Sequence, residues 1–398
     1  MRLFMLISAF LLLSTAAFSA EWPQFRGMKA DGCSPEQGIN KAWNEKAPAV
    51  LWQIPLGDNG HAGPAVAGGK VFIIDHQGDQ DVVRAIDIAT GKDVWTFPYA
   101  DPFKFWNGFA RTTPAVDGDR LYTLSASGQL YCLDIAAGKS VWSKNLVADF
   151  GGIMPKWGYA ISPVVDGEKL IVCPGGADAG VAALNKNTGD VLWKGAPGEI
   201  AGYATPVIAV IDGKRQYVVF AGKALLGLDD AGGKVLWRFP WETRFDVNAA
   251  MPEVIGNTIF ITSGYKHGCA LIEVKGDTAA ARWQNTNMQA SFNAPILVDG
   301  YLYGNSDPGN LVCLELATGN LAWSQGGFDK GGLLAVDGTL IAIQGATGDI
   351  KLVKLQATAY EELGALKPLG GQGWAPPVLA DGKLIVRTTK ALACIDLK

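Results

Sequence analysis

The sequence of 398 residues is poor in histidine and lacks the short motifs that mark common catalytic and metal sites. Its three histidines, His61, His76 and His267, show no metal-ligand spacing and no His-Glu-x-x-His pattern. Gly-x-Ser-x-Gly and Cys-x-x-Cys-His are also absent, so the sequence indicates neither a hydrolase nucleophile nor attached haem. The glycine clusters at 57–63 and 370–373 do not lie between a strand and a helix, and we interpret them as turns rather than phosphate-binding loops.

Basic runs and helical periodicity are missing as well. The net charge is −4 without a basic cluster, which disfavours a nucleic-acid partner. No stretch after residue 20 has the length and apolar character of a membrane span. No long stretch repeats apolar residues at the helical period, and 50 of the 398 residues are glycine, about 13% against a usual ~7%. These features predict a turn-rich all-β protein.

Residues 1–20 have the pattern of a secretory signal. Arg2 precedes the apolar run 3–18, which is shorter than the roughly 20 residues of a membrane-spanning helix, and Ser19 and Ala20 are small. We therefore expect cleavage and export to a periplasmic or extracellular location, with a retained membrane anchor as the alternative. A lipid-anchored form is not expected, because the first cysteine is Cys33. The mature chain would have 378 residues and a net charge of −5.

One hairpin motif recurs along the chain. In its copy at 85–95, Asp87 can accept hydrogen bonds from turn amides, Gly91 can adopt a positive φ, and Trp95 has a large apolar surface to bury. Further copies lie at 132–142, 183–193, 227–237 and 313–323, a lengthened version at 273–283, and a degenerate one without tryptophan at 352–363. We assign a structural role to the repeat residues, which are Trp52, Asp87, Gly91, Trp95, Asp134, Gly138, Trp142, Gly189, Trp193, Asp229, Gly233, Trp237, Trp283, Glu315, Gly319 and Trp323.

A second motif, which we call the proline motif, precedes each hairpin and sets the length of the repeat. It consists of a proline, a few apolar residues, an Asp-Gly type turn and an alternating strand, and its copies run from Pro64 to Pro377 at about 45 residues per unit. Each unit therefore supplies four short strands, the size of one propeller blade. The last unit lacks its fourth strand, and the unpaired strand at 51–56 can supply it. The sequence thus predicts an all-β, eight-bladed β-propeller of four-stranded antiparallel blades, closed by pairing the N-terminal strand with the C-terminal blade.

The repeat also explains three of the six cysteines. Cys132, Cys313 and Cys394 occupy the repeat position held elsewhere by small residues such as Ala85, so we expect them to be buried free thiols. The pairing of Cys33, Cys173 and Cys269 stays open. Each repeat tryptophan is expected to bury about 150–250 Å² between one blade and its neighbour.

With these repeats the chain resembles the pyrroloquinoline-quinone-like (PQQ-like) propeller repeat family over residues 47–398. The lead-in at 21–46, with Trp22-Pro-Gln-Phe-Arg26-Gly27 and the stretch 30–35, resembles the opening of exported bacterial members. The resemblance is greater to the outer-membrane β-barrel assembly lipoprotein than to full quinoprotein dehydrogenases. It implies a lead-in segment packed on a single propeller domain.

The family contains both cofactor-dependent and cofactor-free members, so the resemblance leaves function open. Resemblance to the dehydrogenases would imply PQQ and Ca²⁺ on the propeller axis, with Glu, Asn and Asp near the metal, an Asp base and often a disulfide between adjacent cysteines. This chain has no Cys-Cys pair, is much shorter, and cannot be mapped onto those residues position by position. We therefore expect no cofactor and no metal, with PQQ and Ca²⁺ as the alternative.

Function is expected in the loops that precede the proline motifs, where the repeats differ from one another. These loops should converge on the axis, and they hold nearly all tryptophans of the propeller outside the repeat positions. We predict a non-catalytic scaffold, monomeric, that binds a protein, a small ligand or a glycan there, with a role in cell-envelope protein assembly; loops that merely plug the channel and a small PQQ-dependent alcohol or sugar dehydrogenase are the alternatives. The predicted binding residues are His61, Trp106, Arg111, Trp157, Tyr159, Tyr203, Arg244, Asp246, Asn248, Asn293, Lys330 and Trp374.

Overall fold

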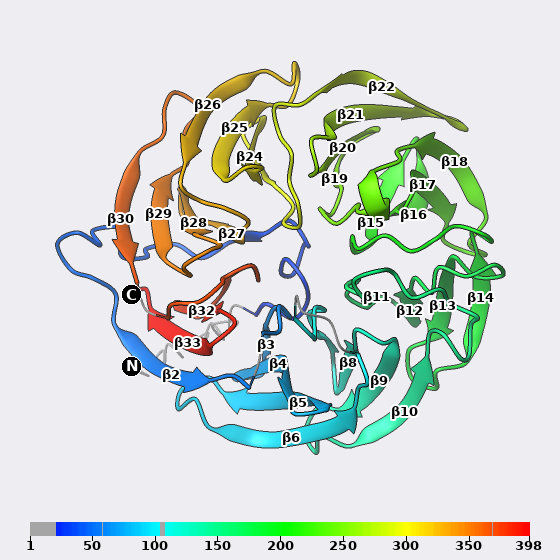
Figure 1. Ribbon diagram of the computed structural model, residues 1–398, viewed down its shortest axis with the longest axis horizontal. Coiled ribbons are helices and arrows are strands. Elements are labelled where there is room, and N and C mark those ends of the chain that lie inside the picture. The colour runs from blue at the N-terminus through cyan, green and yellow to red at the C-terminus, as the bar shows by residue number, and fades with distance from the viewer. Residues whose placement is uncertain (1–20, 58, 104–107, 368) are drawn as a thin grey trace, which may run out of the picture.

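The computed structural model describes residues 21–57, 59–103, 108–367 and 369–398. The predicted signal at 1–20 and the predicted binding residue Trp106 lie outside these ranges. Eight antiparallel sheets follow one another around a central axis, and Figure 1 shows them as a closed ring. The predicted eight-bladed β-propeller is therefore confirmed.

In blades 1 to 7 the four strands run in chain order from the axis outward, whereas in blade 8 the outermost strand is the N-terminal β2. Blades 1 to 3 consist of β3 (Ala65–Ala67), β4 (Lys70–Gln77), β5 (Gln80–Asp87) and β6 (Asp93–Ala100); β7 (Ala115–Asp117), β8 (Arg120–Leu124), β9 (Gln129–Asp134) and β10 (Ser140–Asn145); and β11 (Val164–Asp166), β12 (Lys169–Val172), β13 (Val181–Asn185) and β14 (Val191–Gly195). Blades 4 and 5 consist of β15 (Val207–Ile211), β16 (Lys214–Phe220), β17 (Ala224–Asp229) and β18 (Val235–Pro240); and β19 (Glu253–Ile255), β20 (Thr258–Ser263), β21 (Gly268–Lys275) and β22 (Thr278–Asn285).

Blades 6 and 7 consist of β23 (Ile296–Val298), β24 (Tyr301–Ser306), β25 (Asn310–Glu315) and β26 (Leu321–Gly326); and β27 (Leu333–Val336), β28 (Thr339–Ile343), β29 (Ile350–Lys354) and β30 (Glu362–Leu366). Blade 8 consists of β31 (Val378–Ala380), β32 (Lys383–Arg387), β33 (Ala391–Asp396) and, from the other end of the chain, β2 (Val50–Pro55). A short 3-10 helix, η1 (Arg244–Asp246), lies between blades 4 and 5. The described part of the chain contains no helix long and apolar enough to cross a membrane.

The ring closes where the two ends of the propeller meet. Strand β2 pairs antiparallel with β33, with Val50 opposite Ile395 and Pro55 opposite Ala391, and Figure 1 shows the blue strand beside the red one. This pairing completes blade 8 and covers two sheet edges that would otherwise be exposed. The predicted closure is confirmed.

The repeat hairpin joins five of the blades to the blade before them. The carboxylate of Asp87 accepts hydrogen bonds from the amide and the hydroxyl of Thr90, both at 2.8 Å, and Gly91 has a φ of +70°. The indole of Trp52, from blade 8, lies on Gly91, and its Nε1 donates to the carbonyl of Ile88 at 2.8 Å. The same tryptophan-on-glycine contact joins Trp95 to Gly138, Trp142 to Gly189, Trp193 to Gly233 and Trp283 to Gly319.

Blade 4 departs from this pattern. Its repeat tryptophan, Trp237, is fully buried and donates to Gln216 Oε1 of its own blade at 2.6 Å. The hairpin of blade 5 turns over Gly276 and Asp277 and lacks the Thr-Gly pair seen in other hairpins, so the Trp237 indole has a different neighbour.

All six cysteines are free, including the predicted free thiols Cys132, Cys313 and Cys394.

The lead-in segment crosses the ring. In Figure 1 its dark-blue trace runs from the centre of the ring to the outer edge before it enters β2. Trp22 forms a β-bridge with Val66 of β3, and β1 (Cys33–Ser34) pairs parallel with β27. The lead-in therefore contacts blades on both sides of the closure point.

Candidate functional site

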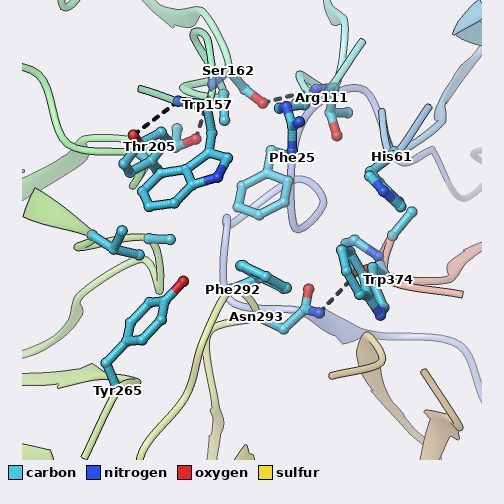
Figure 2. A pocket seen from close by; sticks show the side chains of 18 residues that line it. Phe25, His61, Arg111, Trp157, Ser162, Thr205, Tyr265, Phe292, Asn293 and Trp374 are labelled. Atoms are coloured by element: carbon cyan, nitrogen blue, oxygen red, sulfur yellow. Dashed lines mark hydrogen bonds between the residues drawn. The ribbon is translucent and has the colours of Figure 1, made fainter. Parts of the chain in front are cut away.

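A pocket lies on the propeller axis, where the loops before the inner strands converge. It offers about 140 Å³ to the centres of water-sized molecules, more than one water needs. Figure 2 shows aromatic rings around it together with the guanidinium of Arg111. Its lining consists of Phe25, His61, Gly63, Arg111, Thr113, Trp157, Ala160, Ser162, Tyr203, Thr205, Val247, Ala249, Tyr265, Phe292, Asn293, Trp374, Ala375 and Pro376.

The twelve predicted binding residues do not all lie at this pocket. The lining includes His61, Arg111, Trp157, Tyr203, Asn293 and Trp374. Tyr159 is buried in the core and its hydroxyl donates to the carbonyl of Pro174 at 2.8 Å. Asn248 is also fully buried, and its Nδ2 donates to the carbonyl of Ala221 at 2.8 Å, so these two side chains hold loops in place. Arg244 and Asp246 lie on η1, Lys330 lines a neighbouring recess, and Trp106 lies outside the described residues.

Stacked rings form one wall of the pocket. The His61 imidazole lies against the Trp374 indole with ring centroids 4.6 Å apart, and the Phe292 ring lies 5.0 Å from the same indole. Asn293 Nδ2 donates to the carbonyls of Trp374 at 2.9 Å and Lys330 at 3.0 Å. Figure 2 draws the first of these bonds as a dashed line between Asn293 and Trp374. The amide of Asn293 thus fixes the backbone that carries the wall.

Hydroxyl side chains form a second part of the lining that the sequence analysis missed. The amide of Thr113 donates to Ser162 Oγ at 2.9 Å, and the amide of Ser162 donates to Thr205 Oγ1 at 3.1 Å. Each of these residues directly precedes the proline that opens an inner strand, where an extended backbone is favoured. The Ser/Thr-Pro dipeptides are the sequence signal that could have identified these residues. Their hydrogen bonds link blades 2, 3 and 4 around the axis.

Arg111 supplies the positive charge of the pocket. Its Nη2 donates to the carbonyl of Gly108 at 3.1 Å. Burial lowers the pKa of Arg111 to about 10, so the guanidinium is still charged at neutral pH. Burial also raises the pKa of Tyr203 to about 12, which keeps that phenol neutral. Because the described lining contains no carboxylate, the pocket favours anionic or electron-rich groups.

Phe25 reaches the pocket from the lead-in segment, which no feature of the sequence predicts. Figure 2 shows its ring among the lining side chains. The next residue, Arg26, is buried, forms an ion pair with Glu253 of β19 and donates to the carbonyl of Pro295 at 2.9 Å. Burial raises the pKa of Glu253 to about 7, although the Arg26 guanidinium opposes this shift. The lead-in is thereby anchored to blades 5 and 6 beside the axis.

A rim cluster of cations and aromatic rings lies beside the pocket. The Lys156 ammonium lies 4.3 Å from the centroid of the Phe245 ring, and the Arg244 guanidinium lies 4.7 Å from it. Trp157 and Tyr265, which line the pocket, pack edge-on against Phe245 at 5.6 Å and 6.0 Å. Phe245 and Tyr265 are 41% and 43% exposed, so this apolar surface faces solvent. We use the term rim cluster for these five residues.

The axial pocket does not fit the PQQ and Ca²⁺ alternative. Ca²⁺ takes six to eight oxygen ligands, most of them carboxylates and carbonyls, and the described lining has no Asp or Glu side chain. No group of three or more His, Cys, Asp and Glu residues suited to a metal occurs among the described residues. Arg111 and the aromatic faces could hold a planar anion without a metal, which is a different arrangement.

A family model described as outer membrane protein assembly factor BamB matches residues 37–102 and 78–325. The chain belongs to this family. The outer membrane protein assembly factor BamB of Yersinia pestis is 26% identical over 298 residues, which cover 72% of this chain and 63% of that relative. The chain therefore matches less than two thirds of that relative's length.

Solved structures agree with the fold. The crystal structure of BamB from Moraxella catarrhalis superimposes with a TM-score of 0.65 at 15% identity, over 88% of this chain and 99% of that one, a likeness of fold alone. The quinohemoprotein alcohol dehydrogenase of Comamonas testosteroni is 28% identical over 191 residues, but these cover only 46% of this chain and 26% of the dehydrogenase. The predicted resemblance, nearer to the BamB propeller than to quinoprotein dehydrogenases, is confirmed.

Proposed function

We propose that this chain is an exported, non-enzymatic scaffold that acts as a monomer in outer-membrane protein assembly in the bacterial envelope. Its membership of the BamB family supports this role. The proposed binding surface consists of the rim cluster and the mouth of the axial pocket. The observation that carries the proposal is the exposed pair Phe245 and Tyr265 beside two cations at this mouth.

The chemistry of this surface favours a polypeptide partner with acidic and aromatic side chains. Large aromatic rings exposed beside a concave pocket are typical of interaction sites, because they bury much area on binding. The Lys156 and Arg244 cations, together with Arg111 deeper in the pocket, would pair with carboxylates of the partner. An acidic segment with one aromatic side chain would therefore match the surface in both charge and shape.

The backbone of the rim cluster supports a functional interpretation. Phe245 and Tyr265 of the cluster, and the residues that follow them, Asp246 and Lys266, all have φ between +56° and +66°, the left-handed region that bulky residues avoid. Each such residue costs about 1–2 kcal/mol relative to an ordinary backbone. Strain of this kind tends to be retained where a side chain has to be held in a particular place, here the exposed rings of Phe245 and Tyr265.

The test compares envelope proteins that co-purify with a tagged chain produced in a bacterium that makes it. Phe245→Ala and Trp157→Ala remove rings from the rim cluster and should release outer-membrane assembly proteins that the unaltered chain retains. Leu192→Ala is the matched control, because Leu192 is 50% exposed on the outer strand β14 of blade 3. Retention of every partner by both rim variants would contradict the proposal.

A further inference from the structure

A small recess beside the axial pocket collects oxygen atoms from blade 6 and from the loop that enters blade 7. It shares Phe292 and Asn293 with the axial pocket, and its volume of about 10 Å³ is the space of a single small occupant. Its other lining residues include Asn305, Asp307 and Asp329. No thiol or imidazole contributes to this described lining, so its ligands are hard oxygens and amide or ammonium donors.

Asn305 presents an oxygen that has no partner. The side chain is 4% exposed, and its Nδ2 donates to the carbonyl of Gly331. This bond turns the amide nitrogen toward Gly331 and fixes Oδ1 on the opposite side of the amide. Oδ1 is buried and has no hydrogen-bond partner among the described residues. A buried acceptor left in this state costs about 1–3 kcal/mol, so it calls for a water or a cation.

Two carboxylates in the recess have no cationic partner. Asp307 accepts a hydrogen bond from Ser291 Oγ at 2.9 Å and from the amide of Tyr265 at 3.4 Å, and both donors are neutral. Within the described parts of the chain, neither Asp307 nor Asp329 forms an ion pair. The ammonium of Lys330 lies over the Phe292 ring, 5.3 Å from its centroid. Lys330 is the one cationic residue of the described lining, so two carboxylates against one ammonium leave the recess with a net negative charge.

From these observations we infer that the recess binds a hard cation of the Ca²⁺ class through Asn305 Oδ1 and the carboxylates of Asp307 and Asp329. A water would satisfy the orphan amide oxygen but would leave the two carboxylates uncompensated. Ca²⁺ accepts irregular sets of carboxylate, amide and water oxygens, whereas Mg²⁺ requires a near-ideal octahedron. The cation would tie the β24–β25 turn to the loop before β27. That loop also holds the Lys330 carbonyl, which is bonded to Asn293 at the wall of the axial pocket.

The test titrates chelator-treated full-length protein with Ca²⁺ by calorimetry, and with Tb³⁺ by luminescence excited through tryptophan. The unaltered chain should bind one ion per molecule, and Ca²⁺ should raise its thermal midpoint. Asp329→Asn should abolish the saturable binding and the thermal shift. Within the described chain the Asp329 side chain makes no hydrogen bond and is only partly buried, so the variant should fold. Asp307→Asn should have the same effect on binding.

Asp277→Asn is the matched control, because Asp277 is an exposed carboxylate in the β21–β22 turn of blade 5. It should bind Ca²⁺ as the unaltered chain does. Absence of saturable binding by the unaltered chain would overturn the inference and leave the recess to a water. Binding that persists in both Asp329→Asn and Asp307→Asn would also overturn it, because the ion would then lie elsewhere. Neither result bears on partner capture by the rim cluster.

Discussion

The indole of Trp95 in blade 1 lies against Gly138 in the hairpin turn of blade 2. A Cβ atom at Gly138 would come within 2.5 Å of the ring, and the indole Nε1 donates to the carbonyl of Ile135 in the same turn at 2.9 Å. The contact thus combines ring packing with a hydrogen bond between blades. The glycine contact recurs at five interfaces between blades, so the stability of the propeller depends on several similar contacts.

Gly138→Ala should destabilise the protein more than a glycine substitution in an open turn. Both Gly138 and Gly118 have a positive φ, at +65° and +57°, but only Gly138 has a ring above it. Gly118→Ala should cost about 1 kcal/mol for the left-handed backbone, and Gly138→Ala about 1–3 kcal/mol more because the indole is displaced. Urea denaturation of the two variants measures the difference. Equal losses would show that the indole contact contributes nothing.

Trp52→Ala tests the joint that closes the ring. Trp52 makes the same glycine contact and backbone hydrogen bond as Trp95, but it comes from the N-terminal strand of blade 8. We expect Trp52→Ala and Trp95→Ala each to lower the free energy of unfolding by about 3 kcal/mol, with similar urea midpoints. If the closure were only a loosely attached strand, Trp52→Ala would have a much smaller effect than Trp95→Ala.

The architecture could be predicted from the sequence because the residues that define each repeat hairpin lie close together in the chain. Asp87, Gly91 and Trp95 lie within one hairpin, and the count of such hairpins fixes the number of blades. Even the closure was visible, since one strand at each end lacked a partner. The exception at Trp237 was not predicted, because its environment depends on the shorter hairpin of the following blade.

The lead-in anchor should make stability depend on pH. Burial raises the pKa of Glu253 to about 7 from an ordinary value of 4.5, so the folded state keeps this proton where the unfolded state has lost it. Through this group, stability should be highest below pH 4.5, fall as the pH rises to about 7, and change little above it. In Glu253→Gln, the free energy of unfolding measured across this pH range should no longer show this fall.

Glu45→Gln is the control for this pH effect, because Glu45 is an exposed carboxylate of the same lead-in segment. Its pH profile should match that of the unaltered chain. A Glu253→Gln profile parallel to that of the unaltered chain over the whole range would contradict the account of the anchor.

The candidate site was less predictable than the fold. Trp157 and Trp374 were found because they interrupt the repeat, but Tyr159 and Asn248 interrupt it equally and lie in the core. Whether such a side chain faces the axis or the interior depends on loop conformations that the repeat does not encode. Phe25 was missed because its position rests on the pairing of Arg26 with Glu253, more than 200 residues away in the sequence.

The cofactor alternative gives a further prediction. The described lining of the axial pocket has no carboxylate to hold Ca²⁺ against a quinone, and the carboxylates of the neighbouring recess, Asp307 and Asp329, do not line the axial pocket. Titration of the purified protein with PQQ in the presence of Ca²⁺ should therefore give no saturable change in tryptophan fluorescence. Saturable binding that Arg111→Gln weakens and Leu192→Ala does not would favour the oxidoreductase alternative.

The central claim is that the rim cluster holds a partner of outer-membrane protein assembly, and site-specific photo-crosslinking in the cell tests it most directly. A photoreactive residue replaces Phe245 or Tyr265 in turn, and Leu192 on blade 3 serves as the control position of similar exposure. The account predicts adducts with an outer-membrane assembly protein at both rim positions and none at Leu192. Adducts with that protein at Leu192, and none at Phe245 or Tyr265, would contradict it.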